Sequence, residues 1–106
     1  MIVGMDLCIQ RRKKNNINAP WEELFYARKF WELLDANFVR EYNDSKNSCY
    51  VEARINSEED FDELIEIATH NRNYFENYDS IAGICEARDD FLENKNEYVY
   101  RLVADW

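Results

Sequence analysis

The stretch from Ser57 to Glu93 constrains the fold most, because it combines two amphipathic helical patterns with nearly all of the excess charge of the chain. It contains 12 acidic and two basic residues, so its local balance is −10 while the rest of the chain carries +1. In both halves apolar residues recur at helical spacing and carboxylates occupy the opposite face. We therefore expect two helices that bury one side in a core and expose an acidic side.

Composition limits the classes of protein that this sequence can represent. At 106 residues it suits a single domain, 1–106, and 46% hydrophobic with 15% aromatic residues is enough core material for an ordered fold. A net charge of −9 argues against direct binding to a phosphate backbone or a membrane surface, because both require a basic footprint. The charge favours a partner protein with a basic surface.

The segment 20–38 predicts an aromatic helix. Pro20 suits the first helical position, and Glu22 and Glu23 fall in the first turn, where the helix dipole favours negative charge. Large apolar residues follow at helical spacing: Trp21, Leu24, Phe25, Trp31, Leu34 and Phe38. This surface is either part of the core or a self-association surface.

The acidic stretch predicts two further helices. Ser57 with Asp60 three residues later forms a capping-box pattern, so one helix is expected to begin there and to run to Phe75. The turn residues of 77–80 are expected to break it. A third helix, capped by Asp79 or Ser80, is expected to continue to Glu93.

Alternating apolar residues predict three strands, at 5–10, 49–55 and 98–106. The resulting order is β-α-β-α-α-β. We expect an α+β fold with a small three-stranded antiparallel or mixed sheet and three helices. One face of such a sheet must be solvated or covered by a partner.

No catalytic or ligand-binding motif is present. The two glycines, Gly4 and Gly83, form no phosphate-binding loop, and His70 has no second histidine or cysteine at metal-ligand spacing. We therefore predict no enzymatic activity, no cofactor and no metal.

Cys8, Cys49 and Cys85 are expected to be free, buried thiols of a cytoplasmic protein, because they form no C-x-x-C motif. The alternative is one disulfide and one spare thiol. We find no signal-peptide pattern and no apolar run long enough to cross a membrane.

The run from Arg11 to Lys14 is the only basic cluster. We expect a solvated loop after the first strand, whose loss leaves partner binding unchanged. The alternative is that it contacts an acidic rim or a nucleic acid bound to the partner.

Two motifs resemble those of small uncharacterised phage and prophage proteins: G-M-D-L at Gly4–Leu7 and Y-A-R-K-F-W at Tyr26–Trp31. That group implies no activity and no functional residues. As a small, acidic, single-domain product, the chain is also similar in type to anti-CRISPR inhibitors, several of which present carboxylates in place of nucleic-acid phosphates.

This similarity implies an inhibitor that binds a host defence protein, for example a CRISPR effector nuclease in the host cytoplasm, and a homodimer is compatible with it. The alternative is a structural or assembly protein that self-associates through the aromatic helix 20–38. For the inhibitor, the expected partner-binding residues are Glu59, Asp62, Glu63, Glu66, Glu86, Asp89, Asp90 and Glu93.

Overall fold

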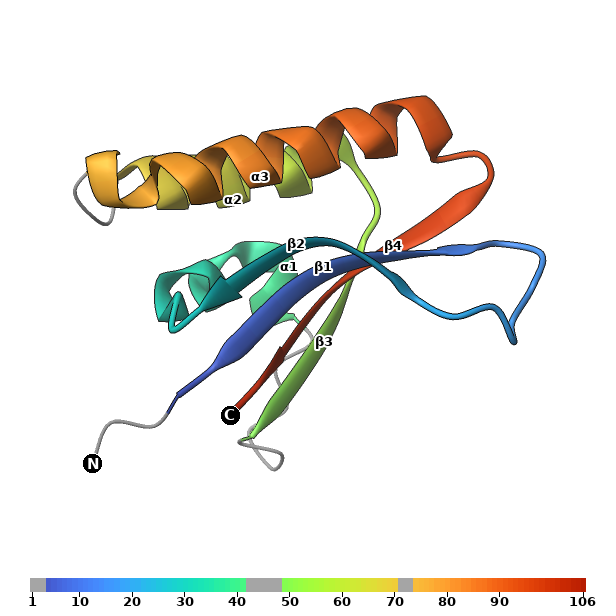
Figure 1. Ribbon diagram of the computed structural model, residues 1–106, viewed down its shortest axis with the longest axis horizontal. Coiled ribbons are helices and arrows are strands. Elements are labelled where there is room, and N and C mark those ends of the chain that lie inside the picture. Colours follow the sequence, from blue (N-terminus) through green and yellow to red (C-terminus); the bar gives the residue numbers. More distant parts are fainter. Residues whose placement is uncertain (1–3, 42–48, 71–73) are drawn as a thin grey trace.

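The computed structural model describes residues 4–41, 49–70 and 74–106, without the side chains of 74–77 (Figure 1). Its elements are β1 (Asp6–Lys13), β2 (Glu22–Arg28), the 3-10 helix η1 (Trp31–Asp35), α1 (Asn37–Arg40), β3 (Tyr50–Ile55), α2 (Glu58–His70), α3 (Tyr74–Asn94) and β4 (Tyr98–Asp105). The strands form one antiparallel sheet in the order β2-β1-β4-β3. The α+β class is confirmed.

The sheet has four strands, so the predicted three-stranded sheet is wrong. The error lies in the segment 20–38, whose first part is strand β2 and not a helix. Phe25 and Ala27 are buried opposite Ile9 and Leu7 of β1, and the register shift after Ile9 leaves Leu24 as an extra residue. Pairing with β1 therefore outweighs the local helix-start signals. Within the segment 20–38, helical turns form only in η1 and at the start of α1.

Two boundaries also differ from the prediction. β1 continues to Lys13, so most of the basic run lies in a strand. α3 begins at Tyr74, which places the predicted break at 77–80 inside a helix. The predicted start of α2 is confirmed, because the helix begins at Glu58, directly after Ser57. The Asp60 carboxylate accepts a hydrogen bond from the Asn56 N–H at 3.0 Å and not from the Ser57 N–H that a capping box would use.

α2 and α3 lie side by side over one face of the sheet (Figure 1). The core between these layers is closed by aromatic contacts: the Phe61 and Phe91 ring centroids are 5.4 Å apart, and those of Phe91 and Tyr100 are 5.2 Å apart. The same core also contains Leu7, Ile9, Phe25, Ala27, Val51, Ala53, Ile55, Leu64, Ala68, Ile84, Ala87, Leu102 and Ala104. Burial on this single face explains why the strands alternate.

The opposite sheet face carries polar and aromatic side chains that bind one another. The guanidinium groups of Arg12 and Arg101 lie over the Trp21 ring at 4.5 and 3.8 Å from its centroid. Arg101 also donates hydrogen bonds to Gln10 and Glu52. Although partial burial by itself raises the pKa of Glu52, the hydrogen bonds from Arg101 and Tyr50 lower it below its usual value. The side chains on this face of the sheet are thus held in place by hydrogen bonds, ion pairs and cation–π contacts with one another.

Candidate protein-binding surface

Carboxylates gather on the outer faces of α2 and α3. By sequence these two helices hold 12 acidic residues and one basic residue, Arg88, so they carry −11 while the remainder of the chain carries +2. Opposite the buried seams, each helix presents three acids with the same spacing of three and four residues. We call this set the acidic surface: Glu59, Asp62 and Glu66 on α2, and Glu86, Asp89 and Glu93 on α3.

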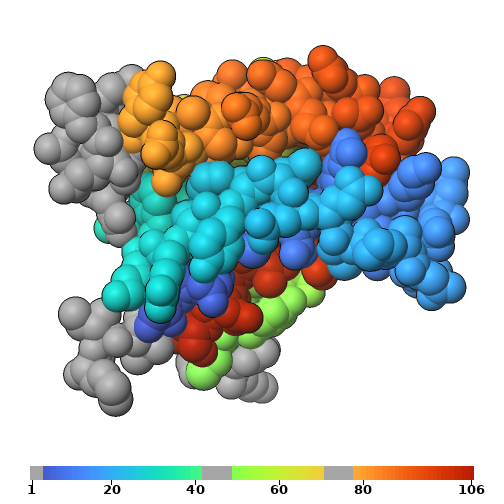
Figure 2. Space-filling model, in the orientation of Figure 1, coloured from blue at the N-terminus to red at the C-terminus, as the bar shows by residue number. Residues whose placement is uncertain are grey.

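The two rows lie on adjacent helices and in overlapping register. Arg88 of α3 donates to Asp62 of α2 at 3.0 Å, and this ion pair joins the rows near their middle. In Figure 2 α3 forms an unbroken ridge along one edge of the molecule. At 1.5 Å rise per residue, each row spans about 10 Å, and the two rows together carry five net negative charges over about 10–14 Å, or one per about 2–3 Å. Duplex DNA has one per about 1.7 Å of axis, so the charge densities agree within a factor of about two.

All six members of the acidic surface are exposed, and five of them make no hydrogen bond or ion pair among the described residues. The sixth, Asp62, is held by Arg88, and this contact raises the pKa of Arg88. The sequence prediction of these six as exposed acids is confirmed. Their role in binding stays a prediction.

Glu63, another predicted binding residue, serves a structural role. Both of its carboxylate oxygens accept a hydrogen bond from the backbone N–H of Asn37 at 2.9 Å. Asn37 is the first residue of α1, so the contact caps this short helix and ties it to α2. Glu63 lies outside the acidic surface.

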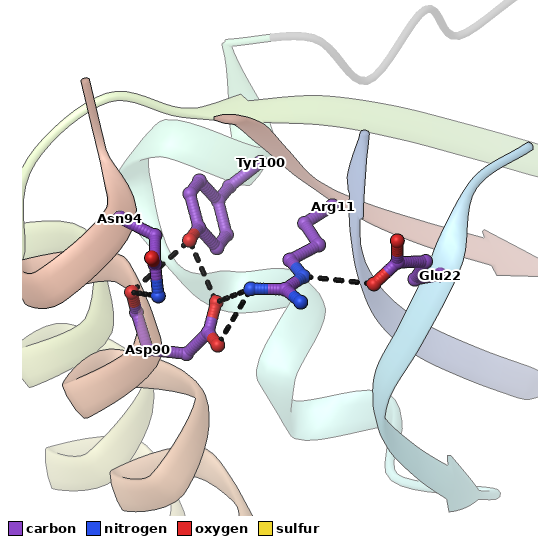
Figure 3. A network of polar contacts seen from close by, with 5 residues as sticks. All are labelled: Arg11, Glu22, Asp90, Asn94 and Tyr100. Carbon is purple, nitrogen blue, oxygen red and sulfur yellow. Dashed lines mark hydrogen bonds and ion pairs between the residues drawn. The ribbon is translucent and has the colours of Figure 1, made fainter. Parts of the chain in front are cut away.

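Asp90, the last predicted binding residue, points into the molecule (Figure 3). Its carboxylate accepts hydrogen bonds from Arg11 Nη1 at 2.8 and 3.0 Å and from the Tyr100 hydroxyl at 2.6 Å. Arg11 also binds Glu22 at 3.0 Å. Partial burial and the Asp90 carboxylate both raise the pKa of Tyr100. Asp90 therefore links α3 directly to β1 and β4, and through Arg11 and Glu22 to β2.

The position of Asp90 along α3 indicates why it does not belong to the acidic surface. It follows buried Ala87 by three residues and precedes buried Phe91 by one, which places it beside the seam. Asp89 and Glu93 are turned away from that seam. The helical pattern could not identify the partner of Asp90, because Arg11 is 79 residues away in sequence.

The basic run divides into structural and exposed residues. Arg11 lies in the Asp90 network and Arg12 lies over Trp21, whereas Lys13 and Lys14 are exposed. The expectation of a solvated loop is therefore wrong for the two arginines. Replacing all four residues would disturb the sheet as well as any binding surface.

The Cys8 thiol is expected to react slowly. Partial burial, the hydrogen bond that it donates to Glu23 at 3.3 Å and the nearby carboxylate charge together raise its pKa to about 12. Because the thiolate is the nucleophile, at pH 8 we expect alkylation of Cys8 by iodoacetamide at least about 100-fold slower than that of an ordinary exposed thiol. Peptide mass spectrometry over time, with exposed Cys49 as internal reference, measures both rates. Glu23→Gln should accelerate Cys8 specifically, and equal rates at Cys8 and Cys49 would contradict the expectation.

His70 is exposed and lies with Asp35, Glu63 and Glu66 around a shallow hollow. Among the described residues, no group of three histidine, cysteine or acidic side chains has a geometry that could hold a metal ion. In the same part of the chain, no helix has both the length and the apolar composition needed to cross a bilayer.

The sequence matches no family model, and searches for similar curated proteins and similar solved structures returned no match.

Proposed function

We propose that this protein is a small inhibitor that binds a partner protein through the acidic surface and occupies a basic, nucleic-acid-binding site of that partner. The observation that carries the proposal is the charge density of the two carboxylate rows, which is within a factor of about two of that of duplex DNA. A basic channel built for phosphates attracts such a surface at long range, because complementary potentials increase the association rate.

The division of charge within the fold supports this orientation. The two helices carry −11 and the remainder of the chain carries +2, so the negative charge is concentrated in α2 and α3. Arg88 is the one base within the two helices, and it is already paired with Asp62. We propose a nucleic-acid-handling host defence protein, such as a CRISPR effector nuclease, as the partner class.

The charge proposal predicts a defined response to neutralisation. We expect the combined variant Glu59→Gln, Glu66→Gln, Asp89→Asn and Glu93→Gln to bind at least tenfold more weakly at low salt, which corresponds to about 1.4 kcal/mol. Raising NaCl from 50 to 300 mM should weaken wild-type binding strongly and the variant only slightly, because salt screens exposed charges. Biolayer interferometry against a purified effector nuclease, with and without its guide RNA, measures both effects.

A matched control separates the position of the charges from their number. The combined variant Asp35→Asn, Glu41→Gln, Glu97→Gln and Asp105→Asn also removes four exposed carboxylates and changes the net charge from −9 to −5. It should bind within about threefold of wild type, or about 0.7 kcal/mol. Equal losses in both variants, or an affinity that does not respond to salt, would overturn the proposal.

The aromatic segment 20–38 does not support the alternative of self-association. Phe25, Phe30 and Phe38 are between 2 and 7% exposed, so they belong to the core. Tyr26 is 49% exposed, but its hydroxyl donates to Asp6. The aromatic helix on which that alternative depended does not form.

A further inference from the structure

A hollow of about 220 Å³ lies where β3 turns away from β4. The pairing of these strands ends at Ile55 and Tyr100, and the chain then leaves through Asn56 toward α2. The first two residues of β4, Tyr98 and Val99, therefore have no partner in β3. They line the hollow together with the turn that follows α3.

The lining of this hollow is basic although the protein is acidic. Lys14, Arg54 and Lys95 contribute to it from three separate segments, and no acidic residue among the described residues lines it. The remaining polar side chains are mainly the amides of Asn56 and Asn96. Lys14 Nζ donates to the Lys95 carbonyl at 3.1 Å, which holds the two lysines at the same rim.

We propose that this hollow binds a single phosphate group. Three cationic residues and two amides supply the donors that a phosphate dianion requires, and lysine is a common phosphate ligand. The volume is below the roughly 300–1,000 Å³ of pockets for drug-sized ligands, so only a small group fits. The net charge of −9 disfavours a long polyanion, because the rest of the surface would repel it.

Neighbouring acids set the boundary of the site. Glu97 follows Lys95 in the same turn but lines the adjoining hollow with Lys13, and Asn96 lines both hollows. Glu52 lies two residues before Arg54 and binds Arg101. The site is also distinct from the acidic surface, so it does not depend on the function proposed above.

Titration of the ¹⁵N-labelled protein with inorganic phosphate, against sodium chloride at matched ionic strength, tests the site. We expect saturable shifts of the Asn56, Asn96 and Val99 amide signals with phosphate alone. Lys14→Gln and Lys95→Gln should each weaken binding at least fivefold. Lys14→Gln keeps a donor for the Lys95 carbonyl, and unchanged chemical shifts elsewhere will show that the fold is kept.

Lys13→Gln is the matched control, since Lys13 is exposed and adjacent in sequence but does not line this hollow. It should change the affinity less than twofold. A loss equal to that of Lys14→Gln would mean general charge attraction and would overturn the proposal, as would shifts that do not saturate.

A second titration distinguishes the source of the phosphate. A short oligonucleotide with a 5′-phosphate is compared with the same oligonucleotide ending in a 5′-hydroxyl. Binding of the phosphorylated oligonucleotide, but not of the 5′-hydroxyl oligonucleotide, supports a nucleic-acid end as the ligand. Binding of inorganic phosphate, but of neither oligonucleotide, supports a free small phosphate. Equal binding of both oligonucleotides at these amides would show that a terminal phosphate group is not what is recognised and would overturn the proposal.

Discussion

Asp90→Ala is expected to destabilise the protein by about 3 kcal/mol, because it breaks a partly buried charged network and leaves Arg11 without its main partner. The side chains of Asp90 and Arg11 are only 23% and 20% exposed, so water replaces the lost hydrogen bonds poorly. The variant also removes the carboxylate that accepts the Tyr100 hydroxyl at 2.6 Å and leaves the backbone carbonyl of residue 90, at 3.1 Å, as its acceptor. Urea denaturation followed by circular dichroism measures the change.

Asp89→Ala is the matched control for this prediction. It makes the same substitution one residue earlier in α3, so the changes in helix propensity and net charge are the same. Asp89 is exposed on the outer side of the helix, and its loss should change the free energy of unfolding by less than about 0.5 kcal/mol. Similar unfolding midpoints for the two variants would show that the Asp90 network does not stabilise the fold.

Gly83→Ala is expected to destabilise the protein by about 1–3 kcal/mol, although alanine favours a helix over glycine by about 1 kcal/mol. A Cβ at this position of α3 would lie 2.7 Å from Cδ1 and 3.1 Å from Cε1 of Phe25. Phe25 is a buried residue of β2, so its ring has little room to move. Thermal unfolding by calorimetry measures the loss.

A second substitution tests whether this close approach is the cause. In the background Phe25→Leu, which removes the ring, Gly83→Ala should become neutral or stabilising, because only the propensity term remains. If Gly83→Ala stabilises the wild-type protein, α3 and β2 do not pack as closely as the structure shows. Gly83 thus allows the long helix to lie directly on the sheet.

Local pattern was sufficient for the buried side of α2 and for strands β3 and β4. The spacing of Phe61, Leu64 and Ala68 predicted which side of α2 is buried, and the structure confirms it. In α3 the expected seam, from Ile81 through Ile84 to Leu92, is only partly correct. Ile84 is buried, but Leu92 is 40% exposed and Phe91 is buried in its place. The alternation in 50–55 and in 98–103 likewise predicted strands β3 and β4. In these segments the spacing of apolar residues matches the positions that are buried in the structure. The local sequence is therefore enough to predict the element there.

Local pattern failed where a partner distant in sequence decides the outcome. The segment 22–28 has both helical spacing and strand alternation, and the pairing of its backbone with β1 selects the strand. The identities of the exposed acids Glu59, Glu66 and Glu93 followed from the sequence by itself, because solvent exposure needs only the helix period. The inward position of Asp90 and its bonds to Arg11 and Tyr100, and the hollow beside Lys14 and Lys95, were decided only by the tertiary structure, which brings together groups that share no local pattern.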